Sequence, residues 1–357
     1  MSKLYSFLIG VLGIIVLLMS GSFILQKKTE STTQSDKLVI YNWGDYIDPD
    51  LLKKFTQETG IEIQYETFDS NEAMYTKVKQ GGTTYDIAVP SDYMIDKMIK
   101  DDLLAKLDKS KLVGMEHIGE EFLGKRFDPQ NDYSLPYLWG TVGIVYNDQL
   151  VDQAPMHWED LWRPEYENSI MLVDGAREVM GIGLTALGYS VNSKDIDQLH
   201  AAEEKLQQLT PNIKAIVADE MKGYMIRGDA AIGVTFSGEA SEMIEGNEHL
   251  HYIVPSEGSN LWFDNLVLLK NMVHEEEAYA FLNFMNQPEN AAQNAEYIGY
   301  ATPNNTAKAL LPDEVKADPA FYPTEDVFEE LEIYENLGAE WLEIYNDLYL
   351  QIKMYRK

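Results

Sequence analysis

The stretch that decides the fold is residues 38–66, LVIYNWGDYIDPDLLKKFTQETGIEIQYE. Its first four residues are an apolar, β-branched run of the kind that a buried parallel strand requires. Asp48 is a candidate N-cap and Pro49 suits the first helical position, so a helix is expected to begin there. Gly60 can adopt the left-handed conformation that ends a helix, and an extended apolar pattern follows. The stretch predicts strand, loop, helix and strand.

The loop between this strand and this helix, YNWGDY at residues 41–46, is the first candidate binding element. In open α/β sheets, ligands bind at the carboxyl ends of the strands, where this loop must lie. Three aromatic side chains and a carboxylate in so short a loop are hard to explain as core. We therefore predict that Trp43, Asp45 and Tyr46 bind a ligand; the alternative is that Trp43 only covers the edge of the sheet.

The composition narrows the class of protein. A chain of 357 residues is long for one hydrophobic core and fits two lobes. Asp and Glu number 59 against 28 Lys and Arg, a formal charge of −31, which argues against nucleic acid or an anionic membrane surface as partner. It favours a cationic ligand, although an acidic surface can also serve only solubility. The absence of Cys excludes disulfides, thiolate catalysis, zinc–cysteine sites and a lipid attached to Cys.

The first residues are a targeting or anchoring segment. We assign residues 1–29 to a signal or N-terminal membrane anchor and residues 30–36 to a polar linker. The apolar run from residue 6 to residue 25 is, at about 20 residues, long enough to span a bilayer. We prefer an uncleaved anchor to a cleaved signal, although Lys27 and Lys28 would then lie on the exported side, against the positive-inside tendency. Either way, the globular part lies outside the cytoplasm.

An aromatic residue beside a carboxylate or hydroxyl recurs where the predicted strands end. Besides the first loop, the set comprises Ser91 and Tyr93, Phe236 beside Ser237, Trp262 and Asp264, and Tyr300. Such a set suits a ligand with ammonium heads and a methylene body, because carboxylates pair with the heads and aromatic faces cover the methylenes. A polyamine is such a ligand. The alternative for Tyr93 is that it only packs on a helix surface.

Glu178 is a further candidate, because it lies in the first turn of a helix predicted after residue 174, where the helix dipole stabilises a carboxylate. The alternative is that Glu178 only caps this helix and pairs with Arg177. The chain has no phosphate loop, no GxSxG elbow and no nucleophile–base pair, and its His residues are scattered. We therefore expect no enzyme, no cofactor and no metal site.

Two extended stretches, residues 133–147 and 265–269, are predicted to cross between the lobes, and residues 324–356 are predicted to be helical. Seven segments then carry a family resemblance: YNWGDYI (41–47), ETGIEIQYETFDSNEAMY (58–75), YDIAVPSDYMIDKM (85–98), DLWRPEY (160–166), DGAREVM (174–180), LWFDNL (261–266) and IGYATPN (298–304). In this order and spacing they resemble the spermidine/putrescine-binding proteins that serve polyamine ABC importers.

The resemblance implies the type II periplasmic-binding-protein fold, in which two α/β lobes are joined by two crossing hinge strands and close over the ligand. Lobe 1 would comprise residues 37–141 and 264–312, and lobe 2 residues 142–263 and 313–357. The protein would capture polyamines and deliver them to an ABC permease in the membrane, and we expect a monomer. Five residues would wall the site from lobe 1, and three would hold ammonium groups and methylenes. The five are Trp43, Tyr46, Ser91, Tyr93 and Tyr300, and the three are Glu178, Trp262 and Asp264.

Two departures from the family leave the preferred polyamine open. Gly175 stands where spermidine-preferring members carry Asp, and Phe236 stands where they carry Trp. The last family ligand falls near Tyr334 or Glu335. Two rival functions also remain: a ferric-ion binder of the same fold that uses Tyr residues as ligands, and a surface glycoside hydrolase that pairs carboxylates with sugar-stacking aromatics.

Overall fold

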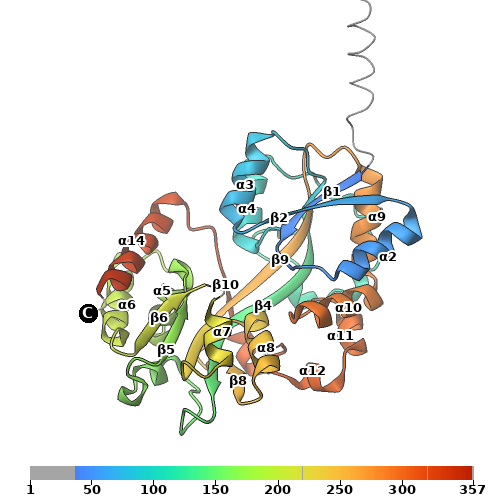
Figure 1. Cartoon of the computed structure of the whole chain (residues 1–357). Helices are drawn as coiled ribbons and strands as arrows, with labels where there is room; N and C mark the ends of the chain where they lie inside the picture. The colour runs from blue at the N-terminus through green and yellow to red at the C-terminus, as the bar shows by residue number, and fades with distance from the viewer. Residues whose placement is uncertain (1–36, 219, 320, 356–357) are drawn as a thin grey trace, which may run out of the picture.

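A computed structural model of the chain describes residues 37–218, 220–319 and 321–355. The chain forms two α/β lobes that are joined by two long strands, as the sequence predicted (Figure 1). The predicted signal or anchor at residues 1–29 and the linker at residues 30–36 lie outside the described residues. Within the described part, no helix combines the length and the apolar character needed to cross a bilayer.

The first lobe contains residues 38–66, which form strand, loop, helix and strand as predicted. Its strands are β1 (Lys37–Trp43), β2 (Glu62–Phe68) and β3 (Ile87–Ala88), and its helices are α2 (Pro49–Thr59), α3 (Asn71–Gln80), α4 (Asp92–Lys100), α9 (Glu275–Asn286), α10 (Pro288–Ile298) and α11 (Asn305–Leu310). The helix α12 (Asp313–Ala317), which the prediction places in lobe 2, has Val315 packed against the cluster that holds Ala307 and Leu311. Both β2 and β3 pair with β1 in parallel. The predicted caps of α2 are confirmed, because the Asp48 side chain accepts the Asp50 N–H and Gly60 has φ 75°.

The second lobe is built on a separate group of parallel strands. Its strands are β5 (Ile170–Val173), β6 (Ile213–Val217), β7 (Ile232–Phe236) and β8 (Leu250–Ile253), and its helices are α5 (Ala176–Ala186), α6 (Ile196–Leu209), α7 (Glu220–Ile226), α8 (Ser237–Gly246) and α14 (Ala339–Tyr355). Here β5 lies between β6 and β7 and pairs with both in parallel. In Figure 1, α14 lies beside α5 and α6 at the outer side of this lobe.

The two crossing strands, β4 (Ser134–Asn147) and β9 (Asn260–Leu268), connect the lobes. The first part of β4, residues 134–141, pairs antiparallel with β9, and residues 142–147 pair with β7 and β8 of the second lobe. The far end of β9 pairs with β3 of the first lobe. The predicted crossings are therefore confirmed, and both lobes share hydrogen bonds with the same two strands.

The C-terminal prediction was wrong in one respect. Residues 324–356 do not form one helical stretch: α13 (Glu325–Glu329) is followed by the short strand β10 (Glu332–Ile333), and α14 begins only at Ala339. The reason is a long-range contact, since β10 pairs in parallel with the first residues of β9. Gly338, at φ 84°, then takes a conformation that favours glycine immediately before α14. The apolar stripe of α14 is core, with Tyr345 and Leu348 buried against the second lobe.

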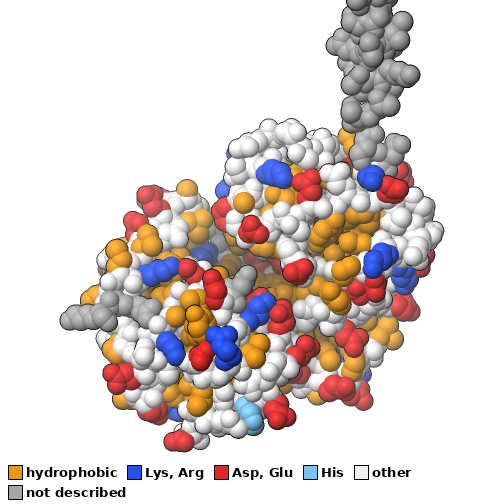
Figure 2. Space-filling view, in the orientation of Figure 1, with side chains coloured by type: hydrophobic (Ala, Val, Ile, Leu, Met, Phe, Trp, Pro, Cys, Tyr) orange, Lys and Arg blue, Asp and Glu red, His pale blue; other side chains and the backbone are white. Residues whose placement is uncertain are grey.

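Three helices begin where strands end between the lobes. Helix α4 follows β3 in the first lobe, and α5 and α8 follow β5 and β7 in the second. Since ligands bind at the carboxyl ends of parallel strands, this arrangement brings the amino ends of the three helices to the expected binding crevice. Figure 2 shows that the surface is hollowed where the two lobes meet.

Candidate ligand-binding site

Asp264 is the residue around which the predicted site assembles. It lies on β9, and its side chain is buried. The Ser91 hydroxyl donates to one of its carboxylate oxygens at 2.6 Å, and the Tyr46 hydroxyl donates to the other at 2.7 Å. Both donors come from the first lobe, so the structure brings together three predicted residues from segments that are far apart in sequence.

The same surroundings set the charge of Asp264. Burial raises the pKa of its carboxyl to about 6, while the hydrogen bonds from Ser91 and Tyr46 act in the opposite direction. The group is therefore mostly ionised at pH 7, and each of its oxygens retains a lone pair for another donor. Asp264 is thus a pre-oriented carboxylate that lacks a cationic partner among the described residues, as no ion pair found there includes it.

Four predicted aromatic residues form a continuous row across the crevice. The ring of Tyr46 lies edge-on to Tyr300 at 5.7 Å between centroids, and Tyr300 lies edge-on to Trp262 at 4.9 Å. Trp262 in turn contacts Phe236 at 6.4 Å, at the end of β7 in the second lobe. The row runs from the first loop through the hinge to the second lobe, so aromatic faces are available on both sides.

Two glycines that sequence reasoning missed allow this row to form. A Cβ on Gly140 of β4 would lie 2.4 Å from the Trp262 ring, and a Cβ on Gly238 of α8 would lie 2.0 Å from the Tyr300 ring. Both distances are far below van der Waals contact, so the rings occupy space that only glycine leaves open. The Tyr300 loop of the first lobe therefore rests directly on the first turn of α8 in the second lobe.

Trp43 and Asp45 have less direct connections to the row. Trp43 is partly buried, and its ring lies 4.6 Å from that of Phe68 on β2. That contact matches the alternative in which Trp43 covers the sheet, and its role in binding stays a prediction. Asp45 is exposed in the loop at φ 47°. It takes no part in the hydrogen bonds found among the described site residues.

Ser91 and Tyr93 are held by a side chain that the sequence did not single out. The Asn71 amide, which is buried at the start of α3, donates to the Ser91 hydroxyl at 3.0 Å and to the Tyr93 hydroxyl at 3.1 Å. Tyr93 donates in turn to Glu72 at 3.3 Å. Polar residues are common in the first turn of a helix, and Asn71 directly follows the N-cap Ser70. The sequence therefore contained no sign that Asn71 binds Ser91 and Tyr93.

Glu178 lies in the first turn of α5, as predicted. Its carboxylate accepts its own backbone N–H, and burial raises its pKa although this bond and the charge of Arg177 lower it. No side-chain capping bond is found at the start of α5, so the capping role of Glu178 stays a prediction. The predicted pair with Arg177 is not formed, because Arg177 donates to the Val191 and Glu335 carbonyls and to Asn192, and no ion pair among the described residues joins it to Glu178.

The C-terminal segment completes the surroundings of Glu178. Tyr334 is buried, and the guanidinium of Arg177 lies 4.1 Å from its ring centroid. Burial, and next the charge of Glu178, raise the pKa of the Tyr334 hydroxyl. Glu335 instead forms an ion pair with Arg126. Of the two C-terminal candidates, Tyr334 is thus the one beside Glu178.

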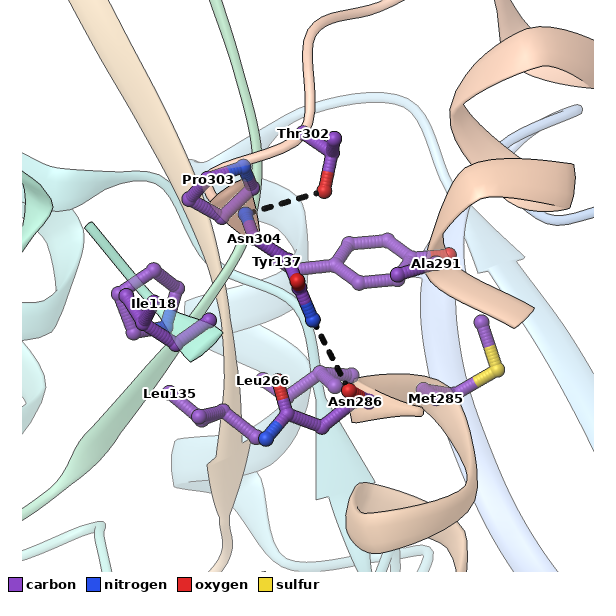
Figure 3. Close-up of a pocket in the computed structure, with 11 residues that line it drawn as sticks. Ile118, Leu135, Tyr137, Leu266, Met285, Asn286, Ala291, Thr302, Pro303 and Asn304 are labelled. Carbon is purple, nitrogen blue, oxygen red and sulfur yellow. Dashed lines mark hydrogen bonds between the residues drawn. The ribbon is translucent and has the colours of Figure 1, made fainter. Parts of the chain in front are cut away.

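A separate small cavity lies inside the first lobe (Figure 3). Its volume is about 10 Å³, room for about one water molecule. Asn286 and Asn304 face each other there, and the Asn304 amide donates to the Asn286 carbonyl at 3.0 Å. None of the predicted site residues lines it, so it is not the binding site. In the part of the chain that the structure describes, no three His, Asp or Glu residues are placed to hold a metal ion.

The chain is similar to known solute-binding proteins. The family model for bacterial extracellular solute-binding proteins matches residues 50–324. The spermidine/putrescine-binding periplasmic protein of Salmonella typhimurium is 39% identical over 342 residues, which are 95% of this chain and 98% of that protein.

Two solved structures are also similar. The crystal structure of the spermidine/putrescine ABC transporter substrate-binding protein PotD from Streptococcus pneumoniae is 66% identical, with a TM-score of 0.86 over 90% of this chain and 100% of that one. A putative spermidine/putrescine ABC transporter from Listeria monocytogenes is 55% identical, with a TM-score of 0.82 over the same shares. The chain therefore belongs to the bacterial extracellular solute-binding proteins and, within them, to the spermidine/putrescine-binding protein family.

Proposed function

We propose that this protein captures polyamines outside the cytoplasm and delivers them to an ABC import permease, without catalysing a reaction. The observation that carries the proposal is the buried Asp264 carboxylate, which Ser91 and Tyr46 orient beside the aromatic row. An ammonium head pairs with such a carboxylate, and the methylene chain that follows lies against aromatic faces. Glu178, on the opposite lobe, supplies a second carboxylate for the other end of the ligand.

Isothermal titration of residues 37–357 with putrescine, cadaverine, spermidine and spermine tests the proposal. We expect saturable binding of at least one of them in a one-to-one complex. The matched control ligand is 1,4-butanediol, which has the four-carbon chain of putrescine without its charges and should not compete. If none of the four amines binds, or if the diol competes equally with putrescine, the site does not recognise ammonium groups.

The relatives named above do not favour the two rival functions. The phenol of Tyr93, one of the two Tyr residues that a ferric-ion site would use, already bonds Asn71 and Glu72. Carboxylates that would act on a glycosidic bond must face each other across that bond, whereas Asp264 is held by two hydroxyl groups and Glu178 by its own helix.

Binding should weaken in acid because of Asp264. With a pKa of about 6, its carboxyl is mostly ionised at pH 7 and mostly protonated at pH 5, while an alkylammonium stays charged throughout. Since the neutral acid cannot pair with a cation, we expect the putrescine affinity to fall about tenfold between pH 7 and pH 5. Titrations across this range check it. The same fall in an Asp264→Asn variant would assign the dependence to another group.

Gly175 is expected to limit the number of ammonium groups that the site holds. It is the N-cap of α5 but offers no side chain, and a Cβ there would lie 2.1 Å from the Glu178 carboxylate, a movable group. In Gly175→Asp, the new carboxylate caps the helix and displaces that of Glu178 toward the crevice. A partly exposed extra pair contributes about 1 kcal/mol, so spermidine should gain roughly fivefold over putrescine. Gly175→Asn, which caps without charge, is the control and should not change the ratio.

We also propose that the N-terminal segment anchors the protein to the outer face of the cytoplasmic membrane, without a covalently attached lipid. The support is the apolar run of residues 6–25 together with the absence of Cys. N-terminal sequencing of the native protein decides between anchor and signal. A start at residue 1 or 2 is expected, and a start near residue 23 would show a cleaved signal.

A further inference from the structure

Asp92 is a buried carboxylate that has no part in the proposed ligand contacts. It is the first residue of α4 and is 1% exposed, between the predicted ligand residues Ser91 and Tyr93. One of its oxygens accepts the Tyr93 N–H at 2.6 Å, and the other accepts the Phe263 N–H of β9 at 3.1 Å. A single carboxylate therefore joins the start of α4 to the hinge strand.

The hydrogen bond between Asp92 and Phe263 matters because of where Phe263 lies on β9. Phe263 lies between Trp262 and Asp264, which are the two predicted ligand residues of the hinge. A hydrogen bond to its N–H fixes the backbone from which both side chains project. Together with the bond from Ser91 to Asp264, it holds α4 and β9 in register at the site. A change in the strength of the Asp92 hydrogen bonds would therefore change how firmly the backbone that carries Trp262 and Asp264 is held.

The surroundings of Asp92 are short of positive charge. The groups that face it are Asp264 from β9, Arg177 from α5, Tyr334 from the C-terminal segment and Tyr93 of its own helix, with Glu72 of α3 behind Tyr93. Arg177 already donates to other groups, and no ion pair among the described residues includes Asp92. Burial raises the pKa of Asp92 to about 8 although its two backbone bonds lower it, and the charge of Asp264 raises it further.

We propose that Asp92 is a positioning residue that holds a proton in the ligand-free protein and releases it to solvent when a cationic ligand binds. The inference rests on the proposed function, since the ligand supplies the positive charge that replaces the proton. The carboxylic acid O–H bond breaks, the proton leaves to buffer, and the carboxylate remains. As a charged acceptor, it then binds the N–H groups of Tyr93 and Phe263 more strongly and tightens β9 against α4.

The sign of the resulting pH dependence follows from linkage. A cation stabilises the ionised form, so ligand binding lowers the pKa of Asp92. Binding then releases a proton in the pH range between this lowered pKa and about 8, and affinity rises with pH across that range. Above that pH the group is already ionised and contributes no further rise. This range lies above the one that Asp264 governs, so the two carboxyls can be separated experimentally.

The experiment is titration of the wild-type protein with putrescine at pH 7 in two buffers of different ionisation enthalpy. We expect release of about half a proton per putrescine at this pH. Asp92→Asn imitates the neutral acid, so it should release almost none. It should match the wild-type affinity at pH 6.5 and fall roughly tenfold below it at pH 8.5. Asp101→Asn, at the exposed end of the same helix, is the control and should keep the release.

The outcomes separate this inference from the proposed function. If putrescine and the other polyamines fail to bind the wild-type protein, the proposed function fails. If putrescine binds with the same heat in both buffers, or if Asp92→Asn releases as many protons as the wild type, Asp92 does not exchange a proton and only the inference fails. A constant affinity ratio between wild type and Asp92→Asn at all pH values assigns Asp92 a purely structural role. The buffer comparison on the wild-type protein decides the case even if the variant does not fold.

Discussion

Replacing Asp264 by Asn is expected to cause a large loss of polyamine affinity. Asn keeps the shape of the side chain but removes the charge that faces the ammonium group. Removing one partner of a desolvated charge pair costs on the order of 2–5 kcal/mol, which is about 30-fold or more in affinity. Titration with putrescine at pH 8 measures this loss. Glu178→Gln should also weaken binding by about tenfold or more, since we propose that Glu178 holds the other end of the ligand.

Asp313→Asn is the matched control for these two variants. It removes the same charge from an exposed side chain of α12, where the ion pair with Lys316 contributes little to stability. Melting curves without ligand show whether each variant is folded. If folded Asp264→Asn and Glu178→Gln both bind as tightly as the wild type, the polyamine lies elsewhere and the proposed site is wrong.

The second large effect is expected from Trp43. Cation–π attraction contributes roughly 0.5–2 kcal/mol, and covering each CH₂ group adds about 0.8 kcal/mol. For three methylenes, Trp43→Ala should therefore cost about 3 kcal/mol, or more than 100-fold in affinity. Trp43→Phe should lose less. The loss should grow from putrescine to spermidine, because a longer chain presents more methylenes to the ring. Titration of the three proteins with both amines tests this.

The contact between Trp43 and Phe68 makes melting without ligand an essential companion measurement. A role in packing alone predicts a lower melting temperature and equal proportional losses for both polyamines. If Trp43→Ala melts much earlier yet binds normally at low temperature, Trp43 is a packing residue. Phe68→Leu, which disturbs the same contact without touching the loop, is the control for stability.

Features with local causes could be predicted from the sequence. The helix α2 needs only Asp48, Pro49 and Gly60 at its ends, and all three act there as expected. Ser70 likewise caps α3 by accepting the Ala73 N–H. The crossing strand β4 is recognisable because its fourteen residues are almost entirely apolar and buried. The candidate residues at strand ends follow from the rule that loops at one edge of a sheet share a crevice.

Features with distant causes could not be predicted in this way. The Asp92 carboxylate and the Phe263 N–H are 171 residues apart, and no sequence pattern around either residue predicts their hydrogen bond. Gly140 and Gly238 look like ordinary glycines until the rings that lie on them are known. The strand β10 exists because β9 offers it an edge, whereas the local pattern of residues 324–356 is helical. In each case the deciding partner lies in another segment.

The three helices that begin at the crevice also determine the sign of the ligand charge. An uncompensated helix start attracts anions, because its free N–H groups carry partial positive charge. Here each start carries an acidic side chain in its first turn: Asp92 in α4, Glu178 in α5 and Glu239 in α8. The helix starts alone would favour phosphates or carboxylates as ligands. With the acidic side chains in place, they favour amines. Selection between these two ligand classes thus depends on a few side chains and leaves the fold unchanged.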